Sequence, residues 1–348
     1  MSRLKLLAAI AVALTVPLLV RAAEPPAADA YRLTGPLTHE NLAIYFVHGK
    51  SRPGPVPLTL QEALAKKAVE VRETGRVNEL QVTNTGDEAI YIQSGDIVKG
   101  GRQDRVLSVS LLLPPHSGAI PIPSYCVEQH RWSGRPGESA ATFDSANAIL
   151  PSRAAKMAMR APKQNEHLSG ADSVYARQQM IWNGVAAIQG QLSSSLGAQV
   201  ASPRSRSSLQ LALENKQLGA KRDEFVNSLQ KAGEKDSDIV GYVVAINGHL
   251  NSAEIYPSNG LFRKMWPVLL RASANEAIKD THGERQPLPT TAHVSSFLGG
   301  ARDAHGVDQA VSATARVNVR ESAKAMMFEA RPAAAPATQW INRSYLAR

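Results

Sequence analysis

Two stretches of the chain concentrate residue types that can do chemistry, and the first spans residues 94–105. Its three glycines allow tight turns and close approach to the backbone. Its lysine and arginines place cations beside the backbone amides that such a turn leaves free, a combination suited to a phosphate or carboxylate. The ligand-binding candidates are therefore members of this stretch and one later arginine: Lys99, Gly100, Gly101, Arg102, Gln103, Asp104, Arg105 and Arg131.

The first stretch is not a P-loop. Gly95 and Gly100 have the required spacing, but Gly101 and Arg102 stand where Lys and Ser or Thr are needed. The alternative is a glycine-bearing bend whose aspartates pair with nearby arginines, because buried Arg–Asp pairs also serve structure. Both interpretations stay open at the level of the sequence.

The second stretch, residues 124–132, carries a thiol, a carboxylate and an imidazole at alternate positions: Cys126, Glu128 and His130. If the stretch is extended, these groups and Trp132 share one face, because side chains alternate along a strand. Such a set could activate the thiol as a nucleophile or ligate a metal. However, a fourth ligand and the usual spacings are lacking, and a lone cysteine is commonly a small buried residue. Cys126 and Glu128 are the catalytic candidates, and we expect no metal and no cofactor.

The elements that position these two stretches are predicted to be mostly strands. Apolar patterning predicts strands over 41–47, 105–113 and 120–132, and a hairpin in which 79–83 and 89–93 flank the turn at 84–87. A short helix is predicted over 58–65, with Thr59 as its N-cap.

Later in the chain the pattern changes to helices and then becomes mixed. Helices are predicted over 151–160, 171–192 and 258–277, the last kinked or split by Pro267. A flexible Ser-rich connection is expected over 193–208. Strands 238–246 and 253–256 should join at a type I′ turn at Asn247 and Gly248, with further strands near 315–319, 325–330 and 340–346.

These elements predict an α+β protein with one folded domain over 31–348. It is β-rich over 31–135 with antiparallel hairpins, mainly helical over 150–235, and mixed over 236–348, where a hairpin and a helix pack with the rest.

Residues 1–22 have the order of a signal peptide: basic residues, an apolar run and small residues at the end. We expect cleavage near Ala22, a Pro/Ala-rich tether over 23–30, and export to the periplasm or the exterior. The apolar run is shorter than the ~20 residues of a spanning helix, and we expect no transmembrane segment in the mature chain.

Composition and net charge limit the classes of binding partner that we expect. The net charge is +9, and without the three basic residues of the predicted signal peptide the chain has 36 basic and 30 acidic residues, or +6. A mildly basic surface favours a small anionic partner. Aromatic residues make up only 5% and no basic stripe is present, so we expect no nucleic-acid partner. Cys126 is the only cysteine, which excludes an intramolecular disulfide, and the sequence indicates no oligomeric state.

Taken together, residues 95–105 and 122–132 resemble the ARG and rhodanese-phosphatase-superfamily-associated protein domain family, and the resemblance extends from about Leu37 to the end. The family name implies a connection to ADP-ribose or phosphate chemistry without assigning a reaction. The family's motif falls on Gly100, Gly101, Gln103, Asp104, Arg105, Cys126, Glu128, Arg131 and Trp132. His130 stands where the family usually has glycine, which argues against a shared Cys–Glu–His metal site.

Three functions fit these observations. The first is an exported module that binds a phosphate-bearing or ADP-ribose-like anion, and the second is an envelope scaffold. The alternative is a hydrolase or transferase in which Cys126 attacks or Glu128 acts as general base, while the arginines stabilise developing negative charge. Export disfavours an intracellular ADP-ribose role, and an unpaired cysteine in an oxidising compartment is expected to be buried.

Overall fold

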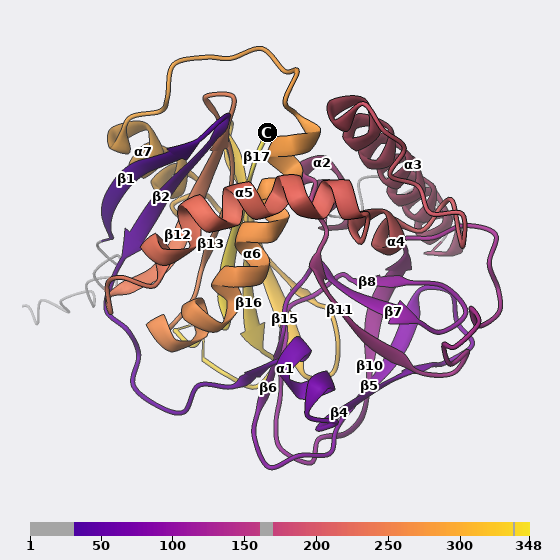
Figure 1. Cartoon of the computed structure of the whole chain (residues 1–348). Helices are drawn as coiled ribbons and strands as arrows, with labels where there is room; N and C mark the ends of the chain where they lie inside the picture. The colour runs from indigo at the N-terminus through magenta and orange to yellow at the C-terminus, as the bar shows by residue number, and fades with distance from the viewer. Residues whose placement is uncertain (1–30, 161–169, 337) are drawn as a thin grey trace, which may run out of the picture. The chain divides into compact units, whose positions relative to one another are not determined.

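The computed structural model describes residues 31–160, 170–336 and 338–348, and Tyr31–Arg348 form one compact unit. The predicted signal peptide (1–22) and tether (23–30) lie outside the described residues. The unit has an α+β fold built on antiparallel sheets (Figure 1). Among the described helices, none has the length and apolar character that crossing a bilayer requires.

The largest sheet has eight antiparallel strands in the order β1-β2-β12-β13-β17-β16-β15-β14. Its strands are β1 (Arg32–His39), β2 (Leu42–His48), β12 (Ile239–Ile246), β13 (His249–Ile255), β14 (Gly306–Ala310), β15 (Ala315–Glu321), β16 (Ala325–Pro332) and β17 (Asn342–Ala347). The predicted β12–β13 hairpin is confirmed, with φ of 53° at Asn247 and 81° at Gly248.

Helices cover both faces of this large sheet. In β2, side chains alternate, so Leu42 and Ile44 enter one apolar core while Ala43 and Tyr45 enter another. On the first face lie α5 (Lys216–Gly233) and α6 (Asn259–Lys279), and on the second lies α7 (Thr291–Arg302). The predicted split at Pro267 is wrong: α6 is one helix, because the buried side chains on either side of Pro267 hold it against β12.

Two smaller sheets form the β-rich part, one of six strands (β11-β7-β8-β10-β5-β4) and one of three (β3-β6-β9). Their strands are β3 (Leu58–Thr59), β4 (Val69–Glu73), β5 (Glu79–Asn84), β6 (Ile90–Ile92), β7 (Asp96–Gly100), β8 (Arg105–Leu107), β9 (Leu111–Leu113), β10 (Gly118–Cys126) and β11 (Phe143–Ile149). The strands of these two smaller sheets share a separate apolar core, in addition to the two cores on the faces of the large sheet.

Two local predictions fail here. The predicted hairpin over 79–93 is wrong, because β5 pairs with β4 and β10 while β6 pairs with β3 and β9. All three side chains of β6 are buried. A strand buried on both faces lies inside the fold, whereas a hairpin strand usually has one face in solvent. The predicted strand 105–113 is divided into β8 and β9, since Ser94 hydrogen-bonds to Ser108 and Ser110 at the bend between them.

The remaining helices are α1 (Leu60–Ala65), α2 (Arg153–Arg160), α3 (Gly170–Leu196) and α4 (Leu209–Leu213). Thr59 caps α1 in a capping box with Glu62, as predicted for the cap. The predicted flexible connection over 193–208 is wrong: its first residues complete α3, and Val200 and Ser208 are buried. Two serines of this segment, Ser205 and Ser208, bond to buried carboxylates of the β-rich part.

Candidate functional site

The glycine turn between β7 and β8 has a conformation that only glycine adopts easily. Gly100 and Gly101 have φ of 119° and 55°, and a Cβ on Gly101 would lie 2.2 Å from the ring of Phe143. The predicted need for close backbone approach is therefore real. The approaching group is a side chain of the protein itself.

The backbone amides of this turn bind anions, but the anions are the protein's own carboxylates. The amide of Gly100 donates to Asp104 Oδ1 at 3.0 Å, that of Arg102 to Glu73 Oε1 at 3.0 Å, and that of Asp104 to Glu128 Oε2 at 3.0 Å. Charge-assisted bonds of this kind are stronger than neutral ones. The backbone amides that the sequence suggested as an anion site therefore bind carboxylates of the protein itself.

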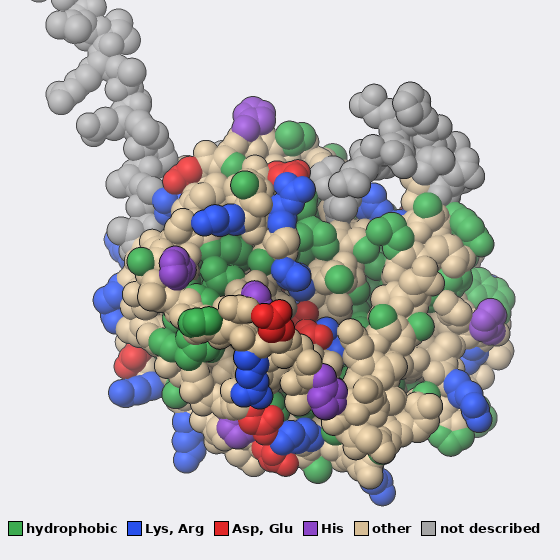
Figure 2. Space-filling view, turned by 90° about the horizontal axis from the view of Figure 1, so that it is seen from above, with side chains coloured by type: hydrophobic (Ala, Val, Ile, Leu, Met, Phe, Trp, Pro, Cys, Tyr) green, Lys and Arg blue, Asp and Glu red, His purple; other side chains and the backbone are tan. Residues whose placement is uncertain are grey.

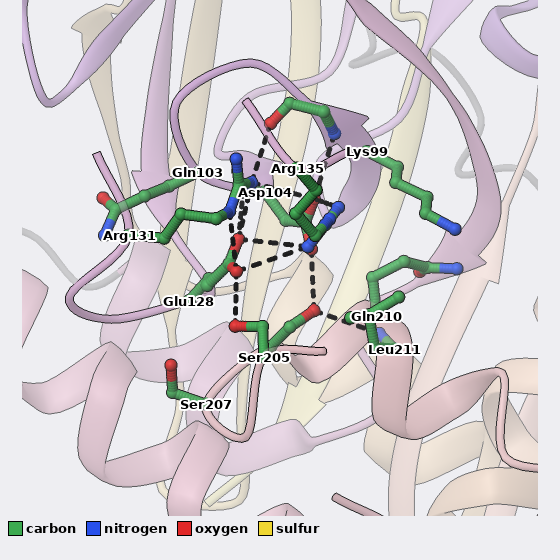
Figure 3. A network of polar contacts seen from close by, with 12 residues as sticks. Lys99, Gln103, Asp104, Glu128, Arg131, Arg135, Ser205, Ser207, Gln210 and Leu211 are labelled. Atoms are coloured by element: carbon green, nitrogen blue, oxygen red, sulfur yellow. Dashed lines mark hydrogen bonds and ion pairs between the residues drawn. The ribbon is translucent and has the colours of Figure 1, made fainter. Parts of the chain in front are cut away.

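Asp104 and Glu128 lie at the centre of a network with two arginines (Figure 3). Arg131 donates to both oxygens of Glu128 at 2.8 and 2.7 Å, and to the carbonyls of Gly100 and Gly101 at 3.1 and 2.9 Å. Arg135 bonds to both Asp104 oxygens and to Glu128. Both acids are fully buried, so these contacts compensate charges that have lost water.

Two serines of the 197–208 loop complete the coordination of these acids. Ser205 donates to Glu128 Oε1, and Ser208 donates to Asp104 Oδ2 at 2.7 Å while accepting from the Leu211 amide as the N-cap of α4. Burial alone would raise the pKa of Glu128, but hydrogen bonds from Arg131 and Ser205 outweigh it and lower that pKa. Glu128 is therefore held as a carboxylate.

Cys126 lies beside a third buried arginine. Arg105 is fully buried, contacts Cys126 Sγ through Nη1, and forms an ion pair with Glu73 at 3.3 Å. Burial raises the pKa of the Cys126 thiol to about 11, and the Arg105 charge lowers it only in part. The ring of Trp132 covers this end, 5.7 Å from the Arg105 guanidinium carbon. We call Glu73, Asp104, Arg105, Glu128, Arg131 and Arg135 the buried ion network.

The structure brings most predicted site residues to this network but not all. Lys99 extends away from the Asp104–Glu128 centre and pairs with Glu214 at 2.8 Å (Figure 3). Gln103 also points away from that centre and accepts a 3.4 Å bond from Arg105. Arg102 stacks on Trp132, 5.5 Å from its ring centre.

The predicted common face of Cys126, Glu128, His130 and Trp132 is wrong. Strand β10 ends at Cys126, and His130 has a φ of 65°, so the chain turns where the prediction kept it extended. Glu128 turns inward because the Asp104 amide and the two arginines bind its carboxylate.

Sequence reasoning missed two members of the network, Glu73 and Arg135, and three residues that bond to it, Glu138, Ser205 and Ser208. The sequence does contain a signal for Arg135 and Glu138, because an acid three residues after an arginine in a Gly/Pro-rich turn can form an ion pair with it. The two serines left none. They lie about 80 to 100 residues from their partners, in a segment whose composition indicates a linker.

Hydrogen bonds next to the buried ion network also hold α3 against β10. Gln178 of α3 accepts from the Cys126 amide and donates to the Cys126 carbonyl, both at 2.9 Å. Trp182, one turn further, donates to the Glu128 carbonyl at 3.1 Å. These three bonds define how α3 lies on the end of β10.

The adjoining part of α3 and β10 lines a cavity of about 290 Å³. Its other walls come from α2, from the β8–β9 bend and from strands β14 to β17 of the large sheet. Val109, Met159, Val174, Val317, Val319 and Phe328 make much of the lining apolar. A cavity of this kind with a few polar groups is the usual form of a small-molecule site.

Two arginines supply the charge of this cavity. Arg160 donates to the Ser94 hydroxyl and carbonyl at 2.9 Å and to the Ser344 hydroxyl, and stacks over Phe328 at 5.5 Å. Burial raises the pKa of Tyr125, and the neighbouring Arg177 guanidinium lowers it part of the way. No Asp or Glu is among the described lining residues.

Elsewhere, two groups of side chains place possible metal-ligand atoms close to one another. They are His39, Glu40 and Glu224, and His48, Asp236 and Asp238. The carboxylates of Glu40, Glu224 and Asp238 already have partners. Lys221 pairs with both glutamates of the first group, and Asp238 pairs with Arg32 and His48. Neither group contains Cys126 or Glu128.

Comparison with known proteins gives one match. A model of the ARG and Rhodanese-Phosphatase-superfamily-associated Protein domain matches residues 30–346, which include the buried ion network and the cavity. No curated protein and no solved structure matches the chain.

Proposed function

The chain belongs to the ARG and Rhodanese-Phosphatase-superfamily-associated Protein domain family, and we propose that it is a non-catalytic module that binds a small molecule in the cavity between α3 and the large sheet. The observation that carries this proposal is the lining: mainly apolar walls with two arginines, at the place where two sheets and two helices meet. We also propose that the module works outside the cytoplasm, after removal of residues 1–22.

In this proposal the buried ion network supports the binding site and does not itself bind the ligand. Glu128 accepts bonds from three side chains and one amide, and Asp104 from two side chains and one amide. An incoming phosphate would have to displace these internal carboxylates from buried arginines, which costs several kcal/mol per ion. An anion at the motif is therefore less favourable than a ligand in the cavity.

The same contacts count against the hydrolase or transferase alternative. A nucleophilic cysteine needs an accessible thiolate, whereas Cys126 is buried with a raised pKa. A general base needs a free lone pair directed at substrate, whereas the Glu128 oxygens are occupied.

The test uses 1-octanol as a neutral probe, observed by saturation-transfer NMR on the full folded chain. We expect saturable binding to the wild type and loss of binding in Val317→Phe, which fills the cavity from β15. Val307→Phe on the neighbouring β14 is the matched control, because Val307 is 55% exposed and does not line the cavity. Equal binding by the filled variant, with an unchanged circular dichroism spectrum, would overturn the proposal.

A further inference from the structure

The cavity's charge and size define a ligand class. Resting on the proposed function, we infer that its ligand is a compact amphipathic anion: an apolar body with one carboxylate or comparable anionic group, bound by Arg177.

The size follows from the volume. The cavity measures about 290 Å³, at the small end of the ~300–1,000 Å³ range of small-molecule sites. A ligand held within its walls is therefore compact.

The sign of the charge follows from the lining. Arg160 and Arg177 line the cavity, and the described lining contains no carboxylate. The buried acid Glu254 is not a lining residue, and it accepts bonds from the lining residues Ser344 at 2.7 Å and Asn342 at 3.2 Å. Because Ser344 also accepts a bond from Arg160, Glu254 compensates Arg160 through this hydroxyl.

The two arginines therefore differ in what they can offer a ligand. Each nitrogen of Arg160 already donates to Ser94 or Ser344. Arg177 donates a long bond, 3.4 Å, to the Met159 carbonyl and also interacts with the Tyr125 hydroxyl, and among the described residues no carboxylate forms an ion pair with it. Its guanidinium can therefore offer the paired N–H groups that match a carboxylate.

The apolar walls define the rest of the molecule. Val174 lies one turn before Arg177 on α3, and Phe328 and Val319 face the cavity from the large sheet. An alkyl or aryl body against these walls removes apolar surface from water, while its anionic end meets Arg177.

The experiment compares three probes of equal chain length by isothermal titration calorimetry: octanoate, 1-octanol and octylamine. A charge-assisted hydrogen bond to Arg177 predicts that octanoate binds at least about tenfold more tightly than 1-octanol, and octylamine more weakly than either. Arg177→Met should abolish the affinity advantage of octanoate over 1-octanol. Arg316→Met is the control, since Arg316 is exposed on β15 beside the lining residue Val317.

The outcomes separate this inference from the proposed function. Equal affinity for octanoate and 1-octanol, or an octanoate advantage that survives in Arg177→Met, overturns the anionic class while binding in the cavity stands. Absence of binding by all three probes overturns both.

Discussion

At the residue scale, the decisive fact is that the carboxyl groups of Asp104 and Glu128 are fully buried and form ion pairs with arginines. Removing a carboxylate from water costs several kcal/mol unless hydrogen bonds replace its hydration. The backbone amides of Gly100 and Asp104, two arginines and two serines supply those bonds. The glycine turn and the second motif stretch are therefore parts of one electrostatic unit.

Neutralising Glu128 should destabilise the protein strongly. Glu128→Gln removes one buried charge and leaves Arg131 and Arg135 partly uncompensated, so we expect a loss of about 3–5 kcal/mol in the free energy of unfolding. Urea denaturation measures it. The control is Glu88→Gln at the exposed Lys66–Glu88 pair, where little should change. Similar small effects in both variants would contradict the central role of Glu128.

The thiol of Cys126 should be unreactive in the native protein. Because the folded pKa is about 11, above the ordinary value of 9.0, iodoacetamide should label Cys126 only after unfolding. The thiol's contribution to stability is complete below pH 9 and is lost as the pH rises toward 11. In Cys126→Ala this part of the pH dependence should disappear. Rapid native labelling at pH 7.5, followed by mass spectrometry, would show that the thiol is accessible.

At the element scale, the contact of α3 with β10 links the network to the cavity. Gln178 satisfies both backbone groups of Cys126, and its neighbour in sequence, Arg177, lines the cavity. A shift of α3 would therefore move the ligand's charged partner as well.

Gln178→Leu should lower stability and weaken octanoate binding together. Each buried backbone group left without a partner costs about 1–3 kcal/mol, and two are affected. Denaturation and calorimetry on the same samples measure both effects. Gln179→Leu, a change of the same kind at the next residue of α3, should alter neither. If octanoate affinity were unchanged in a destabilised Gln178→Leu, the network and the cavity would be independent.

How much of the fold could be predicted from the sequence depended on the range of the determining contact. Asn247-Gly248 and Thr59 act within a few residues, and both predictions are confirmed. The pairing of β6 and the inward turn of Glu128 depend on partners in other sheets and loops. The cavity was not predictable at all, because residues from 94–125, 159–177 and 309–344 meet there only after folding.

At the scale of the whole molecule, the proposed export can be checked directly. Expression with a secretory pathway should give a mature chain that begins at Ala23, as measured by intact mass and amino-terminal sequencing. Leu14→Arg places a charge in the apolar run and should leave the full-length chain, whereas Leu14→Ile should be processed normally. A mature wild-type chain that retains residues 1–22 would contradict the prediction.

The position of β17 in the large sheet has a consequence for cooperativity. This strand, Asn342–Ala347, lies between β13 and β16, with β1 and β2 further along the same sheet. Without β17, β13 and β16 lack the neighbour that joins them. The four strands β1-β2-β12-β13 and the three strands β16-β15-β14 therefore become one sheet only when β17 inserts between them, which couples the two groups of strands in folding.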